Sequence, residues 1–191
     1  MDKFIVNTKS QATSLKLGIP ENYRKECIKE IYRLGDSMNK KTKVQAIMTT
    51  YKIFNESKIF DTLLRNILKI ATKIKIEEDR GIYDNKGTYL NNQSLILKDT
   101  WGAIYEKGHF TESHDHISAS SYLSFVYYLQ AEPNTPLILS DDNQKILPEN
   151  DLFAIFPSYV RHKVPTHEGP EDRIVLAGNI NLLTEKENLN N

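Results

Sequence analysis

The sequence predicts a mainly β domain, a jelly-roll barrel (double-stranded β-helix) with helices in its N-terminal part. Residues 1–80 carry apolar residues at helical spacing, whereas the rest consists of short runs rich in β-branched and aromatic residues, separated by turn sequences. Such runs with few helical signals between them are typical of a sandwich or barrel. At 191 residues the chain suits a single domain. We expect the helices of residues 1–80 to pack on a barrel formed by residues 81–183, followed by a polar tail at residues 184–191.

The individual elements follow from local patterns. Residues 3–8 are expected to form a short opening strand. A helix begins at Pro20, because proline fits the first turn of a helix, and its apolar residues recur every three to four positions up to Leu34. The same spacing predicts a second helix over residues 58–75. Strands are then expected at residues 95–106, 109–116, 122–131, 136–140, 151–156, 160–165 and 172–181.

The charge is balanced overall but unevenly distributed. Lys plus Arg and Asp plus Glu both number 25, so no global field favours nucleic acid or an anionic membrane as a partner. Residues 1–107 hold 20 basic and 13 acidic residues, whereas residues 108–191 hold 5 basic and 12 acidic ones. The acidic half contains all five histidines, which suits a bound cation.

Cysteine usage and apolar runs indicate the compartment. Cys27 is the single cysteine, so it has no partner for an internal disulfide, and it lies on the apolar face of the first expected helix. The first residues lack the features of a signal peptide, and no apolar run approaches the roughly 20 residues that a membrane-spanning helix needs. We therefore expect a soluble, cytoplasmic protein without a membrane segment.

Three histidines form a candidate metal site. His114 and His116 are two positions apart, so both imidazoles lie on one face of an expected strand, and His162 comes from a later strand. Three ligands on one side of an Fe(II) ion leave three positions for a bidentate 2-oxo acid and for O2. Asp115 points to the opposite face, and only a β-bulge could turn it toward the metal.

The remaining histidines are weaker candidates. His109 is five residues before His114, so it faces the other side of a continuous strand. His167 lies in a turn sequence between Pro165 and Pro170. We expect both at the surface or at the rim of the barrel.

Three stretches resemble the Fe(II)- and 2-oxoglutarate-dependent oxygenases, prolyl hydroxylases included. Residues 105–116 resemble the Tyr-x-x-Gly…His-x-Asp stretch of that superfamily, and residues 123–129 resemble its Tyr-Tyr-Leu strand. Residues 156–165, followed by Arg173, resemble its distal-histidine segment. The similarity is nearest to a branch of bacterial and phage oxygenases that carries His-x-His and the phrase Phe-Pro-Ser before the last ligand.

The resemblance implies a jelly-roll, cupin-like enzyme that hydroxylates a C–H bond and uses Fe(II), O2 and 2-oxoglutarate as co-substrate. Arg173 matches the basic residue that binds the C5 carboxylate of 2-oxoglutarate, Tyr127 matches the tyrosine partner of that carboxylate, and Tyr105 matches another pocket-lining position. No catalytic residue is implied beyond the metal ligands. The prolyl-hydroxylase-like motifs favour a peptide, protein or amino-acid-like substrate.

The chain departs from the better-known relatives at His116, where they carry aspartate. A third neutral imidazole leaves the bound Fe(II) more positive, so two alternatives stay open: a three-histidine cupin-type dioxygenase that needs no 2-oxoglutarate, and a non-catalytic jelly-roll module that binds zinc or nickel. Arg173 argues for 2-oxoglutarate, because a guanidinium binds a carboxylate through two parallel hydrogen bonds. Its alternative role is an ordinary ion pair with Glu171 or Asp172.

Overall fold

The computed structural model describes residues 12–35, 42–78, 95–117, 121–139 and 143–182. The strands are Thr13–Lys16 (β1), Val44–Gln45 (β2), Ile47–Met48 (β3), Leu95–Tyr105 (β4), Phe110–His114 (β5), Leu123–Gln130 (β6), Leu137–Leu139 (β7), Gln144–Ile146 (β8), Leu152–Pro157 (β9), His162–Val164 (β10) and Arg173–Leu182 (β11). The helices are Glu21–Leu34 (α1), Ile53–Glu56 (α2), the 3-10 turn Lys58–Phe60 (η1) and Asp61–Glu78 (α3).

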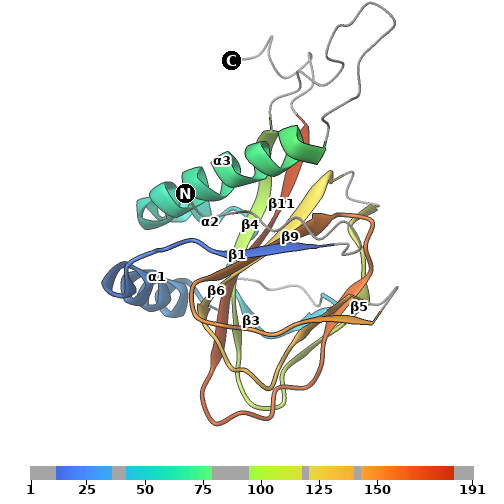
Figure 1. Ribbon diagram of the computed structural model, residues 1–191. Helices are drawn as coiled ribbons and strands as arrows, with labels where there is room; N and C mark the ends of the chain where they lie inside the picture. The colour runs from blue at the N-terminus through green and yellow to red at the C-terminus, as the bar shows by residue number, and fades with distance from the viewer. Residues whose placement is uncertain (1–11, 36–41, 79–94, 118–120, 140–142, 183–191) are drawn as a thin grey trace, which may run out of the picture.

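These strands form two antiparallel sheets, as a jelly roll requires. The larger sheet has the order β1-β9-β6-β11-β4-β3, and the smaller has the order β2-β5-β10-β7-β8. Helices α1 and α3 lie against the larger sheet, on the side away from β5 (Figure 1). The predicted jelly roll with N-terminal helices is therefore the observed fold, and its helices cover one face of the barrel.

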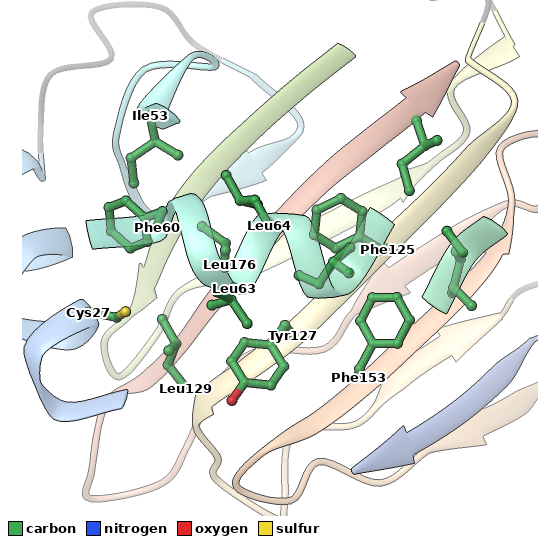
Figure 2. Close-up of a cluster of buried hydrophobic side chains, with 14 of the residues drawn as sticks. Cys27, Ile53, Phe60, Leu63, Leu64, Phe125, Tyr127, Leu129, Phe153 and Leu176 are labelled. Carbon is green, nitrogen blue, oxygen red and sulfur yellow. The ribbon is translucent and has the colours of Figure 1, made fainter. Parts of the chain in front are cut away.

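Two hydrophobic cores lie on the two faces of the larger sheet. The outer core fills the space between this sheet and the helices, where Leu63 and Leu64 of α3 pack near Phe125 and Leu176 (Figure 2). The inner core lies between the two sheets and includes Tyr128. Because successive side chains of a strand point to opposite faces, β6 and β11 contribute alternate residues to each core.

The seven strands expected after residue 94 are all present, but the expected division between a helical and a β part needs correction. Strands β1, β2 and β3 come from the N-terminal part and pair with β9, β5 and β4. Strand β8 was also missed, because strands of two to four residues are too short to show an alternating pattern. The strand expected at residues 3–8 and the tail at residues 184–191 lie outside the described residues.

Within the described part of the chain, neither α3 nor a shorter helix combines the length and the apolar character needed to cross a membrane.

Asp151 fastens the segment between β1 and α1 to the larger sheet. Its carboxylate accepts hydrogen bonds from the backbone N–H groups of Gly18 (2.7 Å) and Ile19 (3.1 Å) and from the hydroxyl of Tyr127 (2.7 Å). Its backbone is in the left-handed region, with φ of 70°. One side chain thus connects the N-terminal segment, the turn before β9 and the outer core.

Replacing Asp151 with alanine should lower the free energy of unfolding by about 3 kcal/mol, because three donors lose their acceptor and alanine disfavours the left-handed backbone. Urea-induced unfolding measures this change. The control is Glu149→Ala, which removes only an exposed ion pair with Lys16 (2.9 Å) and should cost less than about 1 kcal/mol. Equal, small effects of the two substitutions would contradict the anchoring role of Asp151.

Candidate metal centre

The three predicted histidines meet between the two sheets. Strands β5 and β10 are paired, with His114 opposite His162, and His116 follows two residues after the end of the pairing. The ring centroid of His162 lies 4.3 Å from that of His114 and 5.3 Å from that of His116. One potential ligand atom from each residue lies within 4.8 Å of the other two. Among the described residues, this is the one such group of three histidine, cysteine or acidic side chains.

Backbone carbonyls orient two of the imidazoles. The Nδ1 atom of His114 lies 2.8 Å from the Glu112 carbonyl oxygen, and that of His162 lies 3.0 Å from the Val160 carbonyl oxygen. A carbonyl only accepts, so both Nδ1 atoms carry the proton and both Nε2 atoms keep a lone pair for a metal.

Burial also keeps the histidines neutral. It lowers the pKa of His114, and together with repulsion from the positive charge that His114 would carry it lowers the pKa of His116 to about 4 and that of His162 to about 3. The site therefore offers neutral nitrogen donors at neutral pH, which is the state that binds a metal.

Asp115 is not part of the group of three candidate ligands. Its Oδ2 atom lies 3.2 Å from Nη1 of Arg161, and its Oδ1 atom accepts a hydrogen bond from the backbone N–H of Ile117 (3.2 Å). No bulge turns the carboxylate inward, and the metal-binding group of the described residues contains His116 in its place.

Arg173 lies in the same cavity as the histidines, with a side chain that is only 1% exposed. Its guanidinium carbon is 4.5 Å from the ring centroid of Tyr105 and 5.1 Å from that of Tyr128. Its Nε and Nη1 atoms have no hydrogen-bond partner among the described residues. Neither of these two atoms therefore pairs with Glu171 or Asp172, and the Asp172 carboxylate accepts a hydrogen bond from Tyr32.

A buried guanidinium stays charged, and burying an unpaired charge is costly. The inner cavity around Arg173 and the histidines has no aspartate or glutamate among its described lining residues. The walls next to the guanidinium include Thr111, whose Oγ1 lies 2.6 Å from the hydroxyl of Tyr105. The arrangement is that of an anion site beside a metal site.

The structure corrects the expectation for Tyr127. Its ring lies in the outer core, and its hydroxyl donates to Asp151 (Figure 2). The neighbouring Tyr128 faces Arg173, and its buried hydroxyl has no hydrogen-bond partner among the described residues. A shift of one residue along a strand moves a side chain to the opposite face, so two adjacent tyrosines cannot be told apart from the motif alone. Tyr105, in contrast, lines the cavity as predicted.

His167 is also corrected, because it is fully buried and not at the surface. Its Nε2 atom lies 2.7 Å from the Glu171 carbonyl oxygen, and its Nδ1 atom lies 2.9 Å from Oγ1 of Thr135. The carbonyl fixes Nε2 as the donor, so Thr135 donates to Nδ1. The residue holds the turn that leads into Arg173. His109 is half-buried and accepts a hydrogen bond from the backbone of Glu106.

A second, outer cavity of about 360 Å³ opens on the other side of the histidines. Its walls combine His114 and His116 with residues from the N-terminal segments and from β4 and β11: Thr42, Lys43, Val44, Tyr51, Asp99, Trp101, Asp115 and Asn179. Tyr51 and Trp101 meet edge to face, with ring centroids 5.2 Å apart. The candidate metal centre thus lies between the inner cavity that contains Arg173 and an outer cavity of mixed polarity.

No family model matches the chain, and no curated protein matches it in sequence. The structure is similar to the viral collagen prolyl hydroxylase of Paramecium bursaria Chlorella virus-1 in complex with 2OG, with a TM-score of 0.63 and 12% identity over 94% of this chain and 99% of that one. A prolyl-4-hydroxylase from Pseudomonas putida has a TM-score of 0.63 and 15% identity over 91% and 94% of the two chains. HygX from Streptomyces hygroscopicus, with nickel and 2-oxoglutarate bound, has a TM-score of 0.66 and 11% identity over 91% and 84%.

At these identities the similarity establishes the fold. The chain has the jelly-roll fold of these proteins, so the resemblance noted in its sequence is confirmed at the level of fold.

Conservative substitutions of the two adjacent tyrosines should separate their roles. Tyr127→Phe should lower the free energy of unfolding by about 1 kcal/mol and leave 2-oxoglutarate affinity unchanged, because the lost hydroxyl contacts only Asp151. Tyr128→Phe should weaken 2-oxoglutarate binding by about 5- to 10-fold, because it removes a free donor beside Arg173. Calorimetric titration of the Ni(II) protein measures both affinities, and the reverse assignment would restore Tyr127 to the site.

Proposed function

We propose that the chain is a non-haem Fe(II)- and 2-oxoglutarate-dependent oxygenase that hydroxylates a C–H bond. The observation that carries the proposal is the buried guanidinium of Arg173, whose Nε and Nη1 atoms have no hydrogen-bond partner among the described residues, in one cavity with three neutral histidines. A compound with two carboxylates, such as 2-oxoglutarate, would place one carboxylate on Arg173 and the other on a metal held by the three histidines. The similarity in fold to enzymes solved with 2OG or 2-oxoglutarate supports the same assignment.

The residues present fit the metal and the co-substrate. Imidazole nitrogens are suitable ligands for Fe(II), and His114, His116 and His162 would hold it with coordination positions left open. Arg173 would hold the distal carboxylate of 2-oxoglutarate, with the hydroxyl of Tyr128 as a further donor. When bound, the metal would activate O2, which oxidises 2-oxoglutarate to succinate and CO2 and hydroxylates the substrate.

The chain's own contribution is to bind, orient and exclude water. Arg173 gives the co-substrate one direction, because its buried guanidinium is in contact with the rings of Tyr105 and Tyr128. Apolar side chains of the inner cavity surround the remaining space: Ala103, Val126, Leu137, Phe156, Val164 and Val175. A dry cavity strengthens the attraction between a carboxylate and the guanidinium.

The outer cavity is the place for the substrate. Its volume of about 360 Å³ is near the lower end of the range for ligand pockets, which suits one side chain or a molecule of amino-acid size. The similarity to two prolyl hydroxylases supports a peptide or protein substrate. We propose a peptide side chain first and an amino-acid-like molecule second.

His116 favours one rival, a three-histidine dioxygenase that uses no 2-oxoglutarate, because that class also binds its metal through imidazoles alone. The rival leaves the buried charge of Arg173 without an anion. A non-catalytic zinc or nickel module leaves it equally unexplained.

Anaerobic titration of the Fe(II) protein with 2-oxoglutarate should produce a metal-to-ligand charge-transfer band, and substrate turnover should release succinate. Arg173→Gln should weaken 2-oxoglutarate binding by about 10- to 100-fold, because it removes charge-assisted hydrogen bonds. Arg33→Gln, on the exposed side of α1, is the matched control and should leave the titration unchanged. A protein that holds Fe(II) but shows no band at saturating 2-oxoglutarate would not be the enzyme proposed.

His116→Asp should retain metal binding and shift the preference toward harder ions, because carboxylates suit Mn(II) better than imidazoles do. Competition between Mn(II) and Zn(II), followed by the electron paramagnetic resonance of free Mn(II), measures the ratio of affinities. An unchanged ratio would mean that residue 116 does not ligate the metal.

A further inference from the structure

His116 is the one metal-site histidine outside a strand. Strand β5 ends at His114, and strand β10 begins at His162, so both of these are held by the pairing of the two strands. His116 lies in the bend that follows β5. A ligand in a bend needs another restraint, because the sheet does not fix it.

We propose that Asp115 and Arg161 form a clamp that positions His116 for the metal. Both are positioning residues and neither is a ligand. The proposal rests on the metal site of the proposed function, and it is independent of 2-oxoglutarate and of the substrate.

Arg161 contacts the residues on either side of His114, and one of them, Asp115, directly precedes His116. Its Nη1 atom lies 3.2 Å from Oδ2 of Asp115, and its Nη2 atom donates to the carbonyl oxygen of Ser113 (3.2 Å). One planar guanidinium therefore contacts the residues on both sides of His114. The backbone N–H of His116 donates to the carbonyl oxygen of Ser158 (2.9 Å). The bend is thus tied to the turn before β10 by a side chain and by the backbone.

The turn that carries Arg161 is itself well anchored. Ser158 donates its backbone N–H to the carbonyl oxygen of Tyr122 (3.1 Å), and its hydroxyl donates to the carbonyl oxygen of Ser121. The backbone N–H of Val160 donates to the carbonyl oxygen of Pro157 (3.0 Å), and the Val160 side chain is fully buried. The turn therefore forms a fixed base, against which the clamp can hold the bend.

The exposure of the pair argues that its role concerns geometry more than stability. The side chains of Arg161 and Asp115 are 49% and 24% exposed, and ion pairs of this kind contribute about 0 to 1 kcal/mol. Outer partners of metal ligands have a larger effect on the metal, typically about 10- to 100-fold in affinity. The clamp also explains why an acidic residue stands between two ligands without joining them, since Arg161 and the N–H of Ile117 hold both carboxylate oxygens.

The chain contains a closely matched control pair. Lys52 and Asp99 also lie 3.2 Å apart, with side chains 49% and 24% exposed, and Lys52 also donates to a backbone carbonyl, that of Lys98. This second pair does not link the two ligand-bearing segments. A general effect of losing one half-exposed ion pair should therefore appear equally in variants of both pairs.

The test is titration of the metal-free, full-length protein with Co(II), followed by visible absorbance. Arg161→Gln and Asp115→Asn should each weaken Co(II) binding by about 10-fold. The double variant should be no weaker than either single one, because both remove the same contact. Lys52→Gln should not weaken Co(II) binding, because the Asp99 carboxylate that it leaves without its ion pair favours positive charge at His116. Thermal unfolding of the metal-free variants should show that Arg161→Gln and Lys52→Gln are equally stable.

Three results would overturn the clamp. The first is that Asp115→Asn abolishes Co(II) binding whereas Arg161→Gln leaves the affinity unchanged, which would make Asp115 a ligand. The second is a double variant whose loss equals the product of the single losses. The third is an equal loss of affinity in Lys52→Gln. A protein that binds Co(II) as expected but shows no charge-transfer band with Fe(II) and 2-oxoglutarate would refute the oxygenase and leave the clamp in place.

Discussion

The buried charge of Arg173 is the constraint on which the rest of the site depends. Its guanidinium is 1% exposed, contacts two tyrosine rings and lies in the pairing of β11 with β4, and its Nε and Nη1 atoms still have no hydrogen-bond partner among the described residues. Arg173 pairs directly with Tyr105, so the same register sets the cation and one of its aromatic neighbours. The three histidines stand in this cavity as neutral donors, so the fixed charge among its described lining residues is positive.

The pairing of strands from distant parts of the chain assembles the site. His114 and His162 are 48 positions apart and face each other because β5 and β10 pair in antiparallel register. The N-terminal segments add the outer wall, since β2 extends the sheet that carries the histidines and Lys43, Val44 and Tyr51 line the outer cavity. The helices take no direct part in the described site. They cover the opposite face of the larger sheet and keep its strands in place (Figure 1).

Much of this arrangement could be predicted, and the failures have physical reasons. The His-x-His pair, His162 and Arg173 were found because strand alternation and motif spacing are local properties of the chain. The motif points to Tyr127, whereas Tyr128 lines the side of Arg173, because adjacent residues occupy opposite faces and the face depends on register with distant strands. His167 was expected at the surface or rim because its neighbours favour a turn, yet it is buried, and its ring nitrogens bond the nearby Glu171 carbonyl and the buried hydroxyl of Thr135 from another segment. Such partners cannot be seen in a linear sequence.

The two-faced character of the larger sheet has a practical meaning for anyone altering this chain. In the central strand β11, residues with odd and even numbers serve different purposes. The odd positions face the barrel interior: Arg173, Val175 and Ala177. The even positions face the helices: Ile174, Leu176 and Ile180. Substitutions at the odd positions of β11 should therefore change the inner cavity, and those at the even positions should change the packing of the helices on the sheet. The two properties can be altered separately on a single strand.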